Sequence, residues 1–197
     1  ISWTQRIKHP GELYKKGETA KAQALFEKAT KATPKNAWAW LNLSRTRAVL
    51  AKGEAPDDYC AFETNWVLLA LSDLDRAVKL SREPVLKKLD EPDPGIALLQ
   101  KRSEYQTWRE AVAFAGDLTR LAGKWHTRPN GIPTETDVAK VDAGAKVIAL
   151  GKKTYAPRVL DWHFAEGTRS FKALVLENPK DPGDVLYRGP ITADCGQ

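Results

Sequence analysis

The sequence contains no methionine and only two cysteines in 197 residues, and it has no long hydrophobic run. Its best apolar stretch, residues 66–71, is far shorter than the roughly 20 residues that a membrane-spanning helix needs. No glycine-rich phosphate loop follows a strand-like segment, and no Gly-x-Ser-x-Gly motif is present. These absences argue against a membrane-spanning helix, a P-loop nucleotide-binding protein and an α/β-hydrolase.

The two cysteines, Cys60 and Cys195, are too few and too far apart in sequence to predict a zinc site. They could form one disulfide that ties the C-terminal tail to the helical body, or they are two unrelated thiols. The chain begins at Ile1, which we interpret as removal of an N-terminal piece, either a signal peptide or a trimmed segment. The sequence does not decide in which compartment the protein is found. Export to the periplasm or outside the cell is slightly favoured over the cytoplasm.

The chain is basic, with a formal net charge of +6 and a pI of about 9.3. Such a balance can indicate an anionic partner, such as nucleic acid, an acidic membrane surface or an acidic protein segment. The lysines and arginines are scattered, however, and no arginine-rich run or RNA-binding signature appears. We therefore expect a solvated basic surface, and we do not expect nucleic acid as a partner.

Two amphipathic helices are predicted near the N-terminus. Residues 18–32 carry apolar side chains at helical spacing, and Pro34 ends the helix because proline disfavours helix in the residue before it. A second helix is predicted over residues 37–51 and stops at Gly53.

The region from about residue 10 to residue 52 resembles a tetratricopeptide repeat (TPR), in which small residues let antiparallel helices approach and an aromatic fills the groove. The resemblance is carried by Leu13, Tyr14, Lys15, Lys16, Gly17, Ala22, Phe26, Ala29, Pro34, Trp40, Leu43 and Ser44. Pro10 departs from the repeat pattern, so the helix before it is expected to be kinked or to start late. A weaker resemblance to the repeat follows later in the chain, because Leu74 and Ala77 have the same spacing as Phe26 and Ala29.

The remaining periodic segments are also interpreted as helices. Asp93 is predicted to cap a helix that has Pro94 in its first turn. This helix, or a pair of helices, is expected to run to about residue 122. Further helices are expected over residues 58–81, 134–150 and 157–178, with an extended tail over 180–197. The sequence thus predicts an all-α protein of antiparallel TPR-like hairpins, divided into a repeat region (1–90), further hairpins packed on it (91–179) and an extended C-terminal tail (180–197).

No catalytic constellation, metal site or cofactor site is predicted. His163 and Glu166 lie one turn apart on an expected helix and could share a metal or a proton, but this pattern is common by chance and we interpret His163 as an ordinary helical histidine. His126 and His9 have no partner at metal-ligand spacing. Acidic pairs such as Asp73 with Asp75 are interpreted as helix-start and solvent residues, so we expect a non-catalytic protein.

The predicted partner-binding residues are Trp38, Asn42 and Arg45, which recur at helical steps on one face of the helix over 37–51. By the TPR resemblance, Trp40 packs between helices, whereas Trp38 lies on the face that lines the concave groove. Arg45 could meet a carboxylate of a bound peptide. The alternative is that a neighbouring helix buries Trp38.

The expected function is a TPR-like adaptor, scaffold or accessory subunit that binds a protein partner or a multi-subunit assembly in a concave helical groove. This step depends on analogy at the level of the fold. The rival hypothesis is an enzyme or a small-ligand-binding protein whose site lies between the repeat and the C-terminal helices, with His126 and His163 beside a carboxylate.

Overall fold

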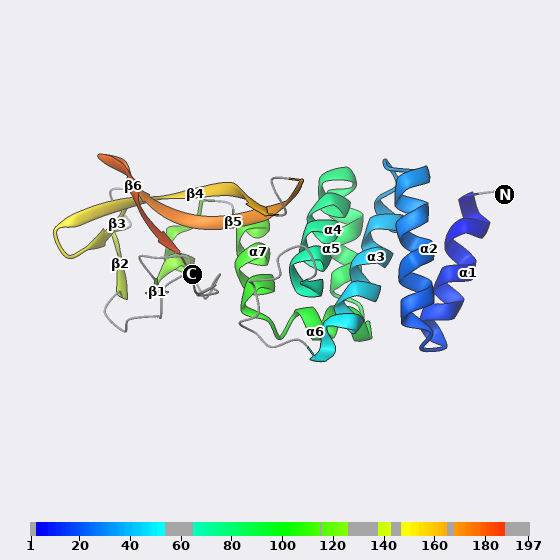
Figure 1. Cartoon of the computed structure of the whole chain (residues 1–197). Coiled ribbons are helices and arrows are strands. Elements are labelled where there is room, and N and C mark those ends of the chain that lie inside the picture. Colours follow the sequence, from blue (N-terminus) through cyan, green and yellow to red (C-terminus); the bar gives the residue numbers. More distant parts are fainter. Residues whose placement is uncertain are drawn as a thin grey trace, which may run out of the picture. The chain divides into compact units, whose positions relative to one another are not determined.

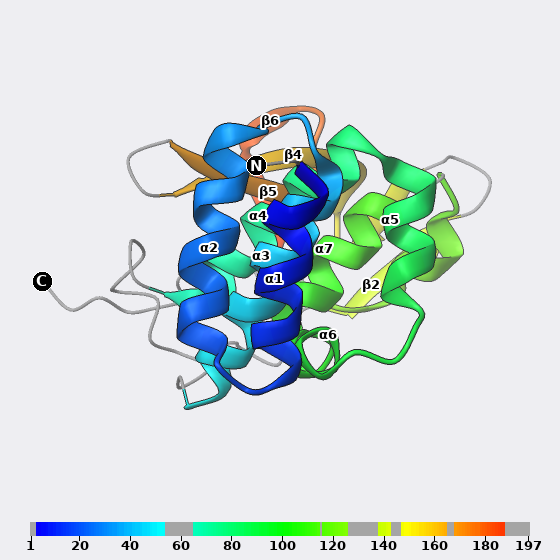
Figure 2. The same cartoon turned by 90° about the vertical axis from the view of Figure 1, so that its right-hand side faces the viewer.

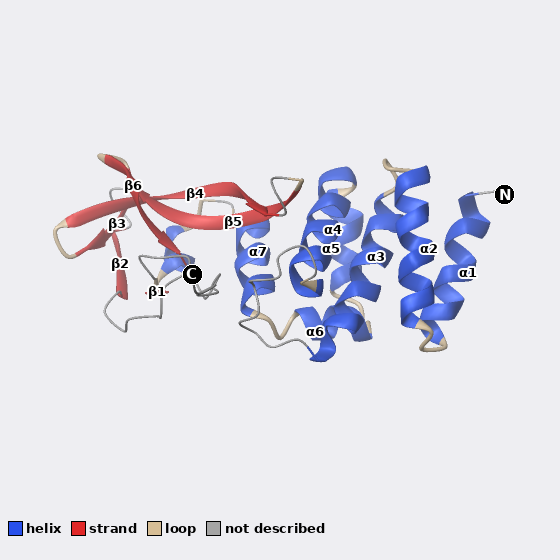
Figure 3. Ribbon diagram, in the orientation of Figure 1, coloured by secondary structure: helices blue, strands red, loops and turns tan. Residues whose placement is uncertain are grey.

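The structure is a computed structural model that describes residues 3–53, 65–114, 116–125, 138–142, 147–164 and 168–187. The described residues form seven α-helices, two short 3-10 helices and six β-strands, so the fold is mixed α and β (Figure 3). The prediction of an all-α protein with an extended tail is therefore wrong. Two compact units are present: residues 1–102 with 163–171, and residues 103–162 with 172–197.

The first unit is helical. Its elements are α1 (Trp3–Lys15), α2 (Thr19–Ala32), α3 (Ala37–Leu50), the 3-10 helix η1 (Ala51–Gly53), α4 (Trp66–Leu80), α5 (Arg82–Leu89) and α6 (Pro94–Leu99). Successive helices pack against each other from α1 to α5, and α3 also contacts α6 (Figures 1 and 2). The helices predicted over 18–32 and 37–51 are confirmed to within one residue at each end.

Local capping signals place the helix starts. The Asn36 side chain accepts hydrogen bonds from the backbone N–H groups of Trp38 and Ala39 in the first turn of α3, and Asn65 accepts one from the Leu68 N–H in α4. Asp93 accepts from the Ile96 N–H, and Pro94 occupies the first helical position, as the sequence predicts. Pro10 lies inside α1.

The core between the first helices contains Phe26, which is 1% exposed and packs with Ala22 and Leu43. The burial expected for Phe26 is thus confirmed. Trp40 is only partly buried against this cluster, and its indole Nε1 donates a hydrogen bond to the Pro34 carbonyl oxygen at 2.9 Å. The proline that ends α2 therefore also fixes the orientation of the tryptophan ring.

The second unit combines a helix with a sheet. Its elements are α7 (Ser103–Ala113), the 3-10 helix η2 (Leu118–Leu121) and the strands β1 (Gly123–Lys124), β2 (Val138–Asp142), β3 (Val147–Leu150), β4 (Lys153–Phe164), β5 (Arg169–Asn178) and β6 (Asp181–Tyr187). The strands follow each other in the order β1-β2-β3-β4-β5-β6. The pairs β1–β2, β2–β3, β3–β4 and β5–β6 are antiparallel. Residues 163–171, at the adjoining ends of β4 and β5, belong to the first unit.

The helices predicted within residues 134–150 and 157–178 are wrong wherever the structure describes these residues, and the tail predicted from residue 180 contains β6. The segment is rich in β-branched and aromatic residues, which favour strands. A two-residue turn, Gly151-Lys152, joins β3 to β4, and Gly151 has a φ of 60°, a left-handed conformation that favours glycine. Both features are typical of a β-hairpin. They determine the structure here, although a few apolar residues of the segment also have helical spacing.

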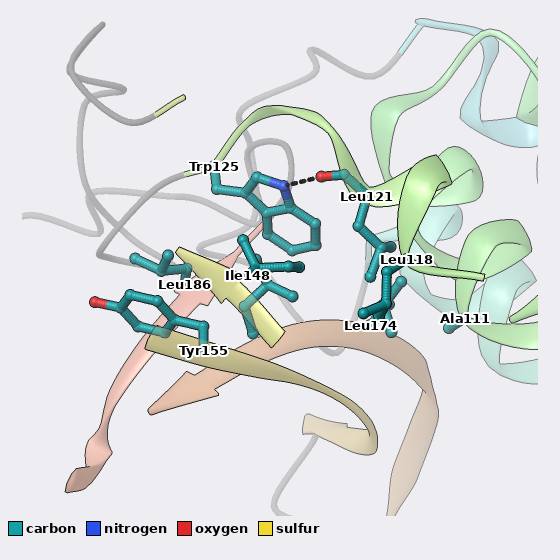
Figure 4. Packing of buried hydrophobic residues seen from close by; sticks show 9 residues of the cluster. Ala111, Leu118, Leu121, Trp125, Ile148, Tyr155, Leu174 and Leu186 are labelled. Carbon is teal, nitrogen blue, oxygen red and sulfur yellow. Dashed lines mark hydrogen bonds between the residues drawn. The ribbon is translucent and has the colours of Figure 1, made fainter. Parts of the chain in front are cut away.

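One hydrophobic cluster holds the second unit together. Trp125, which is completely buried, packs with side chains from α7, η2 and strands β3 to β6 (Figure 4). Its indole Nε1 donates to the Leu121 carbonyl oxygen at 2.8 Å. The buried indole therefore has its polar group satisfied, as such groups usually are.

Candidate functional site

The α3 face that the sequence proposes for partner binding carries three side chains in three different environments. Trp38 is 39% exposed, and its backbone N–H donates to the capping Asn36 side chain at 3.0 Å. Asn42 is half-buried, and its Oδ1 accepts a hydrogen bond from Arg45 Nη1 at 3.1 Å. The three residues thus share a face, and Trp38 is the member at the surface.

Arg45 is held inside the chain instead of facing solvent. Its Nε lies 3.4 Å from Asp93 Oδ2, and each of the two side chains is 13% exposed. Asp93 also accepts a hydrogen bond from the Tyr14 hydroxyl at 3.4 Å, and that hydroxyl accepts one from the Gly95 N–H at 3.1 Å. The carboxylate that Arg45 meets is therefore Asp93 at the start of α6.

This junction changes the acidity of its tyrosine. Burial, together with the nearby Asp93 carboxylate, raises the pKa of Tyr14 to about 12, because both disfavour the phenolate. Tyr14 therefore keeps its proton, and with it the hydrogen-bond donor, to a higher pH than a free tyrosine does. The three elements α1, α3 and α6 are linked through these polar contacts.

A second polar cluster lies around Asp73, which is completely buried on α4. Arg47 Nη1 lies 2.6 Å from one carboxylate oxygen, and Arg169 Nη1 lies 2.9 Å from the other. Burial raises the pKa of Asp73 to about 6, because the cost of desolvating the carboxylate exceeds the stabilisation from the two guanidinium groups. The interpretation of Asp73 and Asp75 as solvent residues is wrong, since both are buried.

A cavity of about 310 Å³ lies beside this cluster, within the first unit. The polar residues of α4 that line it include Ser72, Asp75, Arg76 and Lys79, and the segment 168–170 lines it as well. Sequence reasoning missed this site, although the four residues on α4 have i, i+3, i+4 and i+7 spacing, which places them on one helix face.

The second unit has a larger cavity of about 670 Å³ beside α7 and η2. Phe114, Leu121 and Leu174 supply apolar surface, and Arg109 and Arg120 supply charge. Its volume lies within the range of roughly 300–1,000 Å³ that is usual for small-molecule sites.

The histidines named from the sequence are either exposed or outside the described residues. His9 is exposed on α1, and His163 is exposed on strand β4, so the expectation of a helical His163 is wrong. His126, Glu166 and the two cysteines lie outside the described residues, so the disulfide stays a prediction.

No family model, curated protein or solved structure matches this chain significantly. Within the described ranges, every helix is too short or too polar to cross a membrane.

Proposed function

We propose that the helical first unit is a TPR-like protein-interaction module, acting as an adaptor or accessory subunit of a larger assembly. Its contact face is the side of α3 that carries Trp38. The observation that carries this proposal is the 39% exposure of Trp38 on a capped helix. Tryptophan and arginine dominate binding hot spots, because a large side chain loses much solvent contact when a partner covers it.

The arrangement of the helices supports the same proposal. Consecutive helices α1 to α4 pack in sequence order, as the hairpins of a helical repeat do. Phe26 and Ala22 are buried at the positions that the TPR resemblance assigns to the contact between helices. Trp38 and Trp40 lie two positions apart on α3, so that one indole packs inward and the other is left for a partner.

The partner that fits best is an extended, acidic protein segment with an apolar side chain. The chain has a net charge of +6, and several lysines of the first unit are exposed, including Lys28, Lys31 and Lys35. Opposite charge speeds association and orients the partner, while contact with an exposed aromatic supplies affinity. Arg45 has a positioning role here, because it holds Asn42 and the start of α6.

Affinity capture from the native host, compared between variants, tests this proposal. Trp38→Ala should reduce the recovery of specifically captured proteins and weaken binding of the captured partner about tenfold or more, with an unchanged melting temperature. Val159→Ala is the matched control, since Val159 is 36% exposed on the second unit. Its capture profile should equal that of the wild type.

Two results would contradict the proposal. In one, Trp38→Ala captures the same proteins with the same affinity as the wild type. In the other, the substitution unfolds the first unit, which would place the indole in a core.

Arg45→Ala is expected to lower the melting temperature as well as partner affinity, because it leaves the Asp93 carboxylate unpaired at 13% exposure.

A second candidate function, binding of a small amphipathic ligand, is favoured by the 670 Å³ cavity of the second unit. Ala113 lines this cavity, so Ala113→Trp should fill it and remove binding of a fluorescent naphthalene sulfonate probe. Ala97→Trp, at an exposed position of α6, is the control and should leave probe binding unchanged. Equal probe binding in both variants would rule out this cavity as the ligand site.

A further inference from the structure

The geometry points to an oxoanion-binding site in the 310 Å³ cavity of the first unit, built by Arg76, Arg169 and the hydroxyl groups of Ser72 and Ser170. The ligand would be a small molecule that carries a phosphate or a carboxylate group. This site is separate from the Trp38 face, and the inference does not depend on the proposed protein-binding function.

The wall of the cavity carries more positive than negative side chains. Its lining contains three cationic side chains, Arg76, Lys79 and Arg169, but a single carboxylate, that of Asp75. Lys79 Nζ lies 2.9 Å from Asp75 Oδ2, so this lysine is already neutralised within the chain. Arg76 therefore remains to meet an anion, and so does Arg169, because it shares the single Asp73 carboxylate with Arg47 and one positive charge of that group is left over.

Arg169 is already oriented by an ion pair within the chain. Asp73 is fully buried and holds Arg169 Nη1 at 2.9 Å, while the Arg169 side chain keeps 28% exposure where it lines the cavity. A guanidinium group has five N–H donors, so its bond to Asp73 leaves donors for a ligand. A cation fixed before binding loses little side-chain entropy when the anion arrives.

Arg76 is exposed on α4 and lines the same cavity. No hydrogen bond or ion pair joins it to any residue that the structure describes. Ser72 lies one turn before it on the same helix face, and Ser170 lies next to Arg169. Arginine paired with hydroxyl donors is the usual chemistry for phosphate and carboxylate groups.

Trp40 also lines the cavity, with its indole ring held by the hydrogen bond to the Pro34 carbonyl oxygen. A half-buried aromatic surface beside two guanidinium groups suits a ligand with an apolar or flat part next to its anionic group. The volume of about 310 Å³ is at the lower end of the range for small-molecule sites, which fits a small metabolite.

Isothermal titration calorimetry of the full chain at low ionic strength, with inorganic phosphate and succinate as probes, tests the inference. At least one of these anions should bind, and Arg76→Gln should weaken it about tenfold, as expected for one lost charge-assisted hydrogen bond. Arg76→Lys, which keeps the charge but loses the fork of donors, should cause a smaller loss.

The matched control is Arg82→Gln, which removes the same charge from α5 of the same unit, away from the cavity lining. It should change the affinity less than twofold.

Tighter binding of phosphate would identify a phosphorylated ligand, and tighter binding of succinate would identify a carboxylate ligand. The inference is overturned if neither anion binds at about 10 mM, a concentration well above a millimolar dissociation constant. It is also overturned if the Arg76 and Arg82 variants lose affinity equally, because the attraction would then come from net charge alone.

Discussion

Gly95 should be the position at which a small substitution has the clearest structural consequence. A Cβ atom placed there would lie 2.4 Å from the Arg45 carbonyl oxygen and 2.8 Å from the Tyr14 hydroxyl. Helix propensity alone predicts that Gly→Ala in a helix gains about 1 kcal/mol. The contact predicts the opposite sign, because the nearest atom belongs to the backbone of α3 and cannot rotate away.

The size of the loss follows from two effects. Forcing an extra methyl group into a packed contact costs about 1–3 kcal/mol. Moving α6 away would also break the hydrogen bond from the Gly95 N–H to the Tyr14 hydroxyl, which contributes about 1 kcal/mol. After the gain in propensity is subtracted, Gly95→Ala should destabilise the chain by about 2 kcal/mol, which corresponds to a fall in melting temperature of roughly 4–8 °C.

Gly11→Ala is the matched control, because Gly11 lies within α1 and no heavy atom lies within 4 Å of the added Cβ. This variant should gain up to about 1 kcal/mol. Urea unfolding followed by circular dichroism measures both changes in free energy. If Gly95→Ala is as stable as the wild type, α6 does not approach α3 as closely as described, and the reasoning about this junction fails.

Three further predictions concern buried or half-buried side chains of the first unit. Phe26→Ala should cost about 3–5 kcal/mol in urea unfolding, and a loss below about 1 kcal/mol would mean that Phe26 is not a core residue. The pKa of Tyr14 is raised from 10.0 to about 12, so between these pH values the native state holds a proton that the unfolded chain releases. The free energy of unfolding should therefore fall as the pH rises from about 10 to 12. It should fall less in Tyr14→Phe, which has no phenol to titrate. The pKa of Asp73, raised from 3.8 to about 6, predicts likewise that its contribution to stability is lost as the pH rises from about 4 to 6. Unfolding of Asp73→Asn across this range should lack that decline, and an equal slope in both proteins would contradict the raised pKa.

The N-terminal helices could be predicted because their signals are local. The apolar spacing in α2, the proline after it and the capping Asp93 before α6 all act within a few residues of the feature they define. Amphipathic helices of about 14 residues give enough repeats for the 3.6-residue period to be distinguished from alternation. Their boundaries were therefore the most reliable part of the prediction.

The strands were missed because short apolar runs fit more than one period. Phe171 and Leu174 have a helical spacing of three, yet both are buried on strand β5. The distinguishing information was in the turns: Gly151-Lys152 between two runs rich in β-branched residues indicates a hairpin. Weighting this turn above the apolar spacing would have predicted a meander of strands.

The partner of a buried charge is harder to predict, since it depends on contacts between distant parts of the chain. Arg45 was assigned to an external carboxylate, but Asp93, 48 positions later in the sequence, already supplies one. Asp73 likewise pairs with Arg169, 96 positions later in the sequence, and no local pattern predicts this pairing.

A partial signal for the cavity is the polar spacing of Ser72, Asp75, Arg76 and Lys79 on an otherwise apolar helix. Polar side chains on one face of such a helix must meet solvent, a partner or each other, because burying them unpaired is costly. In this chain the polar face of α4 lines a cavity. Lys79 is paired with Asp75 there, whereas Arg76 stays exposed. Arg76 is therefore the residue whose substitution tests anion binding.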